Sequence, residues 1–152
     1  MTRVNCIDPE LLLDQWLQAH LREGLRPVNE RLSGRPYHNA PSHYKLGSGH
    51  CLFHRKHCEY TLNLWLQAKK EYDRRGYQGF DWKPPVEAVR ALQTEDYIPS
   101  VADKRLNLAR LIVRWRKNPS LYTFCKNPVH TRQQMRDWVE MVKTHEELEN
   151  GE

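Results

Sequence analysis

Apolar residues recur every three or four positions along several stretches of the chain, which is the spacing of an amphipathic α-helix. The first stretch opens with Asp8-Pro9-Glu10, where a capping acid precedes a proline at the first helical position. We expect a helix from Asp8 to about Glu23, with Trp16 and Glu23 on the flank of its polar side. Its apolar side is made of Leu13, Leu17 and Leu21.

A longer apolar stripe follows a loop. Residues 32–45 contain two prolines and one glycine, which predicts the loop. Beyond it, a continuous helix is expected from about Ser48 to about Arg75, and it would form the centre of the core. The positions that step by three and four are Cys51, His54, Cys58, Thr61, Trp65, Ala68 and Tyr72.

A third helix is predicted after a connector. Residues 76–100 hold three prolines and two glycines around one short helical piece, Val86 to Leu92. Ser100 and Asp103 have the spacing of a capping box, and Asn118-Pro119 ends the helix that they begin. Its basic edge, formed by Arg110, Arg114 and Lys117, lies opposite an apolar edge.

The predicted fold class is all-α, because no alternating run of β-branched residues occurs anywhere in the chain. At 152 residues we expect a single compact domain of three main helices with long loops. Residues 131–149 predict a further helix, with Met135, Val139 and Val142 along one side. We therefore divide the chain into a main unit, residues 1–126, and a C-terminal helical extension, residues 127–152, whose role the sequence does not indicate.

The composition indicates what class of partner the protein binds and in which cell compartment it works. The net charge of +5 favours a polyanionic partner. The longest purely aliphatic run, Leu11 to Leu13, is too short for a membrane span or a signal peptide, so we expect a soluble cytoplasmic protein with no membrane partner. The four cysteines show no C-x-x-C pattern, which favours reduced thiols.

The N-terminus offers a nucleophile. A small second residue favours removal of Met1, which would expose the α-amine of Thr2. An α-amine has a pKa of about 7.7–8.0 against about 10.4 for lysine, so far more of it is neutral near pH 7.5. Such an amine can attack C1′ of a deoxyribose, and the resulting imine permits β-elimination. The chemistry needs a carboxylate for proton transfer, and Glu23, between Arg22 and Arg26, is the candidate. An ordinary solvated helix end has the same composition and remains the alternative.

Short motifs spread over residues 2–126 resemble those of the phage-type pyrimidine-dimer DNA glycosylases, the small endonuclease V type that repairs ultraviolet damage. They occur in the family's order: T-R-V-N at 2–5, D-Q at 14–15, R-E-x-x-R at 22–26, L-G-S-G-H at 46–50, D-Y-I-P at 96–99, A-R at 109–110 and P-S-L-Y at 119–122. The resemblance implies a bifunctional DNA glycosylase and AP lyase that acts on cyclobutane pyrimidine dimers in double-stranded DNA. It also implies Thr2 as the nucleophile and Glu23 as the catalytic carboxylate, with no metal or other cofactor. We expect a monomer near the nucleoid of a bacterial or phage-infected cell.

The resemblance also implies which residues bind DNA or shape the site: Arg3, Gln15, Arg22, Arg26, Arg110 and Arg114. Lys117 extends the basic edge of the third helix and is expected to join them. Tyr122 and Phe124 lie in an aromatic segment where rings either stack on bases or close the core.

Two departures from the family leave the lesion open. Trp16 stands where the family has a histidine, and His20, one turn later, is a possible substitute. The aromatic segment has smaller side chains at Leu121, Thr123 and Cys125. The alternatives are the same imine chemistry on another lesion or an abasic site, a DNA-binding module without catalysis, and an interaction protein whose partner docks on the C-terminal helix.

A metal site is the weaker interpretation of the central helix. Cys51, His54 and Cys58 share one helical face, but a single helix rarely supplies a closed tetrahedral site. We expect these residues to be buried thiols and packed imidazoles.

Overall fold

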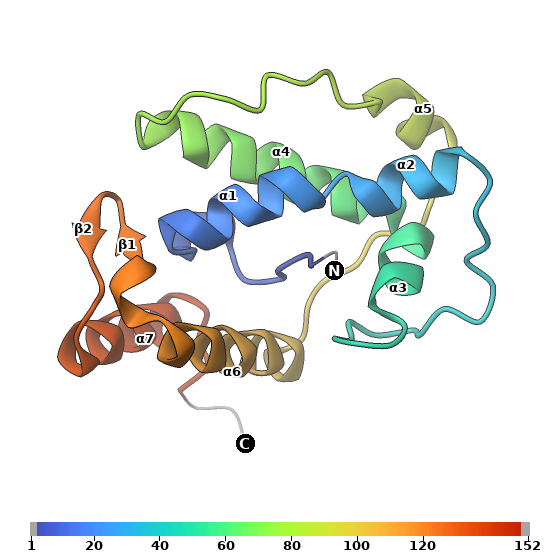
Figure 1. Cartoon of the computed structure of the whole chain (residues 1–152). Coiled ribbons are helices and arrows are strands. Elements are labelled where there is room, and N and C mark those ends of the chain that lie inside the picture. Colours follow the sequence, from blue (N-terminus) through green and yellow to red (C-terminus); the bar gives the residue numbers. More distant parts are fainter. Residues whose placement is uncertain (1–2, 150–152) are drawn as a thin grey trace.

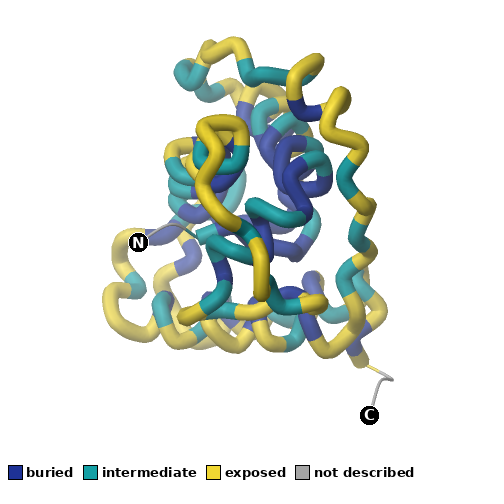
Figure 2. The backbone as a smooth tube through the Cα atoms, turned by 90° about the vertical axis from the view of Figure 1, so that its right-hand side faces the viewer, coloured by how far each residue is buried: buried dark blue, intermediate teal, exposed yellow. Residues whose placement is uncertain are grey.

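The computed structural model describes residues 3–149, and its regular secondary structure is almost entirely helical, which confirms the all-α prediction (Figure 1). Helix α1 (Asp14–Glu23) packs along α4 (Cys58–Arg74) in the middle of the molecule. Helices α6 (Val101–Lys117) and α7 (Arg132–His145) lie together on one side. Buried positions gather where the helices face one another, whereas exposed positions follow the loops (Figure 2). Within residues 3–149, no helix combines the length and the apolar content that crossing a membrane requires.

The first helix begins later than predicted. Asp8 caps a short 3₁₀ turn, η1 (Pro9–Leu11), in which its Oδ1 accepts a hydrogen bond from the Glu10 amide at 3.0 Å. The backbone is then extended before α1 begins at Asp14. The predicted start at Asp8 is therefore wrong for α1, because this cap serves η1. The predicted apolar side is confirmed by three side chains with no exposed surface, Leu13, Leu17 and Leu21.

The predicted central helix is divided into two. A separate helix, α2 (Arg26–Leu32), follows α1 and was not predicted. After the loop comes α3 (His50–Lys56), and His57, with φ −96° and ψ 58°, separates it from α4. The prediction of one continuous helix from Ser48 to Arg75 is therefore wrong. Only His57 leaves the helical conformation, so the apolar positions on either side keep their spacing of three and four residues. The sequence pattern therefore does not reveal the break.

Helix α6 begins and ends as predicted. The hydroxyl of Ser100 accepts a hydrogen bond from the Asp103 amide at 3.1 Å, and the Asp103 carboxylate accepts one from the Ser100 amide, which completes the capping box. The helix ends at Lys117, just before Asn118-Pro119. The connector before it contains the expected short helix, α5 (Val86–Ala91).

The chain between α6 and α7 forms a small antiparallel hairpin of β1 (Thr123–Phe124) and β2 (Asn127–Pro128), which the sequence did not predict. The predicted division between residues 126 and 127 falls where the turn of this hairpin meets β2. Helix α7 begins after a second capping box, made by Thr131 and Gln134. Its buried side chains belong to the same core as those of α1: Met135, Trp138 and Val142.

Candidate active site

Side chains, not backbone ladders, hold the N-terminal segment, residues 3–8. The amide of Val4 donates to Nε2 of His50 at 2.9 Å, and the amide of Asn5 donates to Nδ1 of His20 at 3.3 Å. Both imidazoles are buried. His20 comes from α1 and His50 from α3, so the segment is fixed to two helices at consecutive residues.

Asn107 of α6 binds the next two amides. Its Oδ1 accepts from the amides of Cys6 and Ile7 at 2.9 and 3.2 Å. Its Nδ2 donates to Oδ1 of Asn5 at 2.9 Å. Because the side chain of Asn107 is buried, every polar atom of its amide group is used within the core. We name His20, His50 and Asn107 together the imidazole socket.

The socket works only while its imidazoles are neutral. Nδ1 of His50 lies 2.6 Å from the carbonyl oxygen of Lys45, so Nδ1 carries the proton and Nε2 is free to accept from Val4. Burial lowers the pKa of His50, and burial together with the nearby His50 lowers the pKa of His20 to about 4. Both rings are therefore neutral hydrogen-bond acceptors at pH 7.

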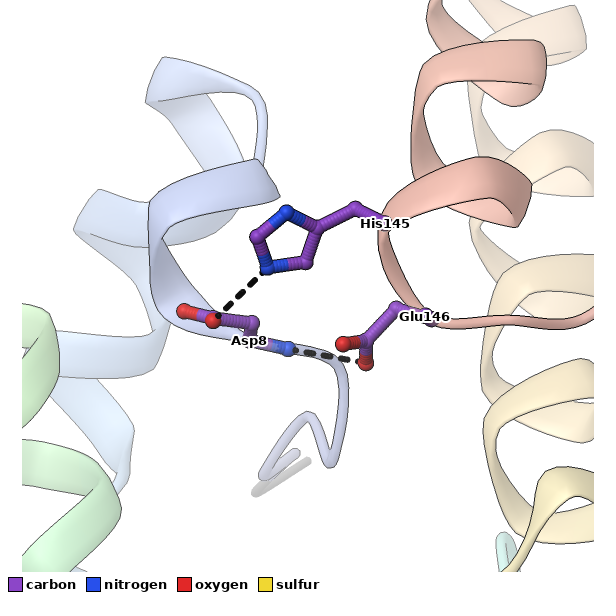
Figure 3. A group of neighbouring side chains, drawn as sticks. All are labelled: Asp8, His145 and Glu146. Carbon is purple, nitrogen blue, oxygen red and sulfur yellow. Dashed lines mark hydrogen bonds and ion pairs between the residues drawn. The ribbon is translucent and has the colours of Figure 1, made fainter.

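The far end of the segment is tied to the end of α7 (Figure 3). Nε2 of His145 lies 3.3 Å from Oδ2 of Asp8, and the Asp8 amide donates to Oε2 of Glu146 at 3.4 Å. Within residues 3–149, these are the side chains close enough together to share a metal ion. The Asp8 carboxylate already caps η1, and Lys104 lies 3.3 Å from Oε2 of Glu146. These contacts explain the group without a metal ion: they attach the end of α7 to the N-terminal segment.

The residues considered for a metal in the central helix pack in the core. Cys58 is fully buried, and Nδ1 of His54 lies 2.8 Å from Oγ1 of Thr61. Cys51 is partly exposed on α3, and all four cysteines are free thiols. Burial raises the pKa of Cys58 to about 11, which keeps it a thiol at neutral pH.

A small pocket lies between α1, α6 and the N-terminal segment. Four of the predicted site residues line it: Arg3, Glu23, Arg110 and Arg114. The pocket has a volume of about 30 Å³, enough to hold a water-sized group. One acidic and three basic residues therefore line the same pocket, and these four come from three parts of the chain: the N-terminal segment, α1 and α6.

Three further polar atoms belong to residues that line this pocket and have no hydrogen-bond partner among the described residues: Nη1 of Arg3, Nε1 of Trp16 and Nε2 of His20. Since Nδ1 of His20 accepts from Asn5, its Nε2 carries the proton. All three atoms are thus donors, and a buried donor without an acceptor is costly.

The other predicted site residues lie elsewhere. The Gln15 side chain bonds Thr123 through both polar atoms, at 3.1 and 2.9 Å. Tyr122 is buried, with its ring centroid 5.0 Å from that of Trp16. The guanidinium of Arg75 lies 5.0 Å from the ring centroid of Phe124. These three side chains fix the hairpin and the core.

The remaining predicted cations are exposed. Arg22 and Arg26 line a second groove next to the pocket, and Lys117 is exposed at the end of α6. Thr2, the predicted nucleophile, lies outside the described residues. Its neighbour Arg3 is the first residue that the structure describes.

Sequence reasoning missed Asn107, His50 and Tyr44 as parts of the site. The hydroxyl of Tyr44 donates to the carbonyl oxygen of Val4 at 2.8 Å and so fixes the segment from the loop side. A signal existed for Asn107, because it lies beside Leu108 and one turn before Leu111 on the apolar side of α6. A polar amide in such a stripe indicates a buried partner.

A buried carboxylate, Asp14 at the start of α1, fixes the hairpin. Arg75, at the end of α4, donates to Oδ1 of Asp14 at 2.8 Å and also binds Glu71 at 2.6 Å. The other donors to Asp14 are Tyr77, the hydroxyl of Thr123 and the amides of Cys125 and Lys126. Burial opposes ionisation of Asp14, but these hydrogen bonds outweigh it and lower its pKa. We name Asp14, Glu71 and Arg75 the carboxylate anchor.

The chain matches none of the protein-family models against which it was scanned, and a search of curated proteins gives no match either.

Proposed function

We propose that the protein is a DNA glycosylase with AP lyase activity, which removes cyclobutane pyrimidine dimers from double-stranded DNA through an imine of the Thr2 α-amine. One observation carries the proposal: Arg3, the residue bonded to Thr2, lines a single pocket with Glu23, Arg110 and Arg114. The imidazole socket holds the residues that follow Arg3. The first residue that the structure describes thus lines a pocket together with one acidic and two further basic residues. We further propose that it acts as a monomer on DNA in the cytoplasm.

The reaction assigns one role to each group. The neutral amine attacks C1′ as the C1′–N bond to the damaged base breaks, and the proton that the amine loses passes to the departing base. The C1′–O4′ bond then breaks with proton transfer to O4′, which opens the sugar ring and leaves a protonated imine between C1′ and the nitrogen of Thr2. Removal of a C2′ proton then expels the 3′ phosphate by β-elimination. Glu23 stabilises the cationic sugar and moves these protons, while Arg3, Arg110 and Arg114 bind flanking phosphates. The scheme uses no metal or redox cofactor.

The size of the pocket favours chemistry at the sugar over recognition of a base. A volume of about 30 Å³ admits an oxygen atom but not a nucleobase. We propose that the amine attacks C1′ outside this pocket and that the geometry of the DNA backbone decides which lesion is chosen. This observation also supports a second candidate substrate, a plain abasic site, which needs no base pocket.

Borohydride trapping tests the proposal. Protein whose N-terminus is shown by mass spectrometry to be Thr2 is mixed with an ultraviolet-irradiated duplex or an abasic duplex and reduced. We expect a covalent adduct whose cross-linked peptide begins at Thr2, and no adduct when Met1 is retained. An adduct with abasic DNA alone would select the second candidate. Binding without any adduct would leave a DNA-binding module.

A matched pair of variants tests Glu23. Glu23→Gln removes the carboxylate from the pocket, whereas Glu87→Gln changes an exposed residue of α5. Strand cleavage should fall by at least a hundredfold in Glu23→Gln and remain unchanged in Glu87→Gln. Equal cleavage by the two variants would remove Glu23 from the mechanism.

A further inference from the structure

A second groove lies beside the candidate active site, between the end of α1, α2 and the connector near Trp82. It has a volume of about 650 Å³. Four cations line it: Arg22, Arg26, Arg35 and Lys83. Arg22 and Glu23 are consecutive on α1, so their side chains point about 100° apart. The groove and the pocket therefore flank the same helix end.

The charge of the groove is strongly positive. Its only carboxylate among the described lining residues is Glu30, whose Oε2 lies 3.0 Å from Arg35 and 3.1 Å from Arg55. Glu30 is thus already paired with two guanidinium groups. Side chains of Arg35 and Lys83 remain exposed, which suits a flexible polyanion that passes along the groove.

A fixed aromatic face stands among these cations. Trp82 is 50% exposed, the most exposed of the five tryptophans. Its ring is stacked on the buried Trp65, with centroids 6.2 Å apart and planes 14° apart. Phe80 packs edge-on against it at 5.2 Å. One face of the indole is supported by the core, which leaves the ring held in place with open surface.

The backbone around Trp82 is constrained to present this ring. Phe80 has a φ of 55°, a left-handed conformation that is rare for a bulky side chain. Nζ of Lys69 donates to the carbonyl oxygen of Gly79 at 2.9 Å and to Oδ1 of Asp81 at 3.1 Å. Strain of this kind persists only where surrounding contacts impose it.

We propose that this groove binds single-stranded DNA, with one base stacked on Trp82 and the neighbouring phosphates on Arg22, Arg26, Arg35 and Lys83. Aromatic platforms flanked by cations bind unpaired bases regardless of sequence, because every base has a π face. The choice of DNA rests on the proposed function, whereas binding in the groove does not depend on imine chemistry.

Equilibrium binding of an undamaged oligo-dT to the full chain tests this site, because no covalent step contributes. Trp82→Leu should weaken binding about tenfold or more, while Trp82→Phe should retain most of the affinity. The other four tryptophans are at most 5% exposed, so quenching of intrinsic fluorescence by oligo-dT should be lost in Trp82→Phe. Thermal unfolding checks that each variant is folded. Equal affinity of folded Trp82→Leu and the parent protein would overturn the proposal.

A lysine pair supplies a second test that does not disturb the aromatic packing. Lys83→Gln should lower the slope of log affinity against log salt by about 0.7, the share of one phosphate contact on a single strand. Lys143→Gln, on α7 at the opposite side of the molecule from α2, is the matched control (Figure 1). An equal change in both variants would mean a diffuse surface effect and would overturn the site. Failure of borohydride trapping with oligo-dT binding intact would refute only the catalytic proposal.

Discussion

The N-terminal segment and the β1–β2 hairpin are both irregular backbone, and buried side chains hold both, but the two sets of side chains differ in charge. The imidazole socket uses neutral acceptors, His20, His50 and Asn107. The carboxylate anchor uses an ionised Asp14 beside the buried Arg75. Neutral acceptors avoid the large desolvation penalty of a buried charge, whereas the anchor requires an ion pair to offset it.

The difference matters for what each region carries. The hairpin carries no predicted catalytic group, so the charged side chains of the carboxylate anchor affect no step of the proposed reaction. In the proposed reaction the Thr2 amine must lose a proton before it attacks C1′, and a further carboxylate added to Glu23 would favour its protonated form. A neutral socket fixes the segment without adding negative charge.

Breaking the anchor should have the largest effect. In Arg75→Met, Asp14 and Glu71 lose a partner whose side chain has no exposed surface, and the free energy of unfolding should fall by about 3–5 kcal/mol. Arg74→Met is the matched control, because Arg74 pairs with Glu71 while its side chain is 64% exposed. It should lower the free energy of unfolding far less, because water screens an exposed ion pair. Urea denaturation measures both, and similar losses would mean that burial does not distinguish the pairs.

Acid should separate the two regions. The pKa of His20 on α1 is about 4 in the fold against an ordinary 6.5, so between these values His20 binds a proton when the segment is released but not when it accepts from Asn5. The socket therefore weakens as pH falls below 6.5, by about 3 kcal/mol in total for His20. The pKa of Asp14 is lowered, so the anchor keeps its contribution above pH 3.8 and loses it only at lower pH.

Amide hydrogen exchange followed by NMR measures this order. After correction for intrinsic rates, protection at Val4 and Asn5 should decline between pH 6.5 and 4.5, while protection at Cys125 and Lys126 should persist. Parallel loss at both sites would show that the segment is not released separately.

Replacing the Asn107 side chain of the imidazole socket should lower the free energy of unfolding by a smaller amount. Asn107→Leu leaves the amides of Cys6 and Ile7 without an acceptor, and we expect a loss of about 2 kcal/mol. Asn29→Leu, at an exposed position of α2, should stay within about 0.5 kcal/mol of the parent protein. Chemical denaturation compares them, and an unchanged Asn107→Leu would mean that solvent replaces the lost acceptor.

Short sequence patterns predicted the main helices well, but they did not predict the break between α3 and α4 or the β1–β2 hairpin. The ends of α6 followed from Ser100, Asp103 and Pro119 because capping and proline effects act over a few residues. The break at His57 left the apolar spacing intact and so gave no signal. The hairpin depends on Asp14, more than a hundred residues away from the amides that it binds, and no local pattern reports such a contact.

The site was predicted in part for the same reason. Arg3, Glu23, Arg110 and Arg114 lie together in the structure, although their spacing along the chain did not require it. Gln15 and Tyr122 have chemistry suited to DNA, yet the structure uses them to fix Thr123 and to pack against Trp16. Residue type indicates what a side chain can do, but its neighbours in space decide which use it has.

Two buried cysteines lie in regions that open separately, so their alkylation rates report two different opening events. Cys6 lies buried in the N-terminal segment, and burial raises its pKa, so an alkylating reagent can reach a reactive thiolate only while the segment is open. Cys58 is buried in α4, at the centre of the core, and reacts only when the core itself opens. The ratio of the two alkylation rates therefore measures how often the N-terminal segment detaches for each time that the whole molecule unfolds.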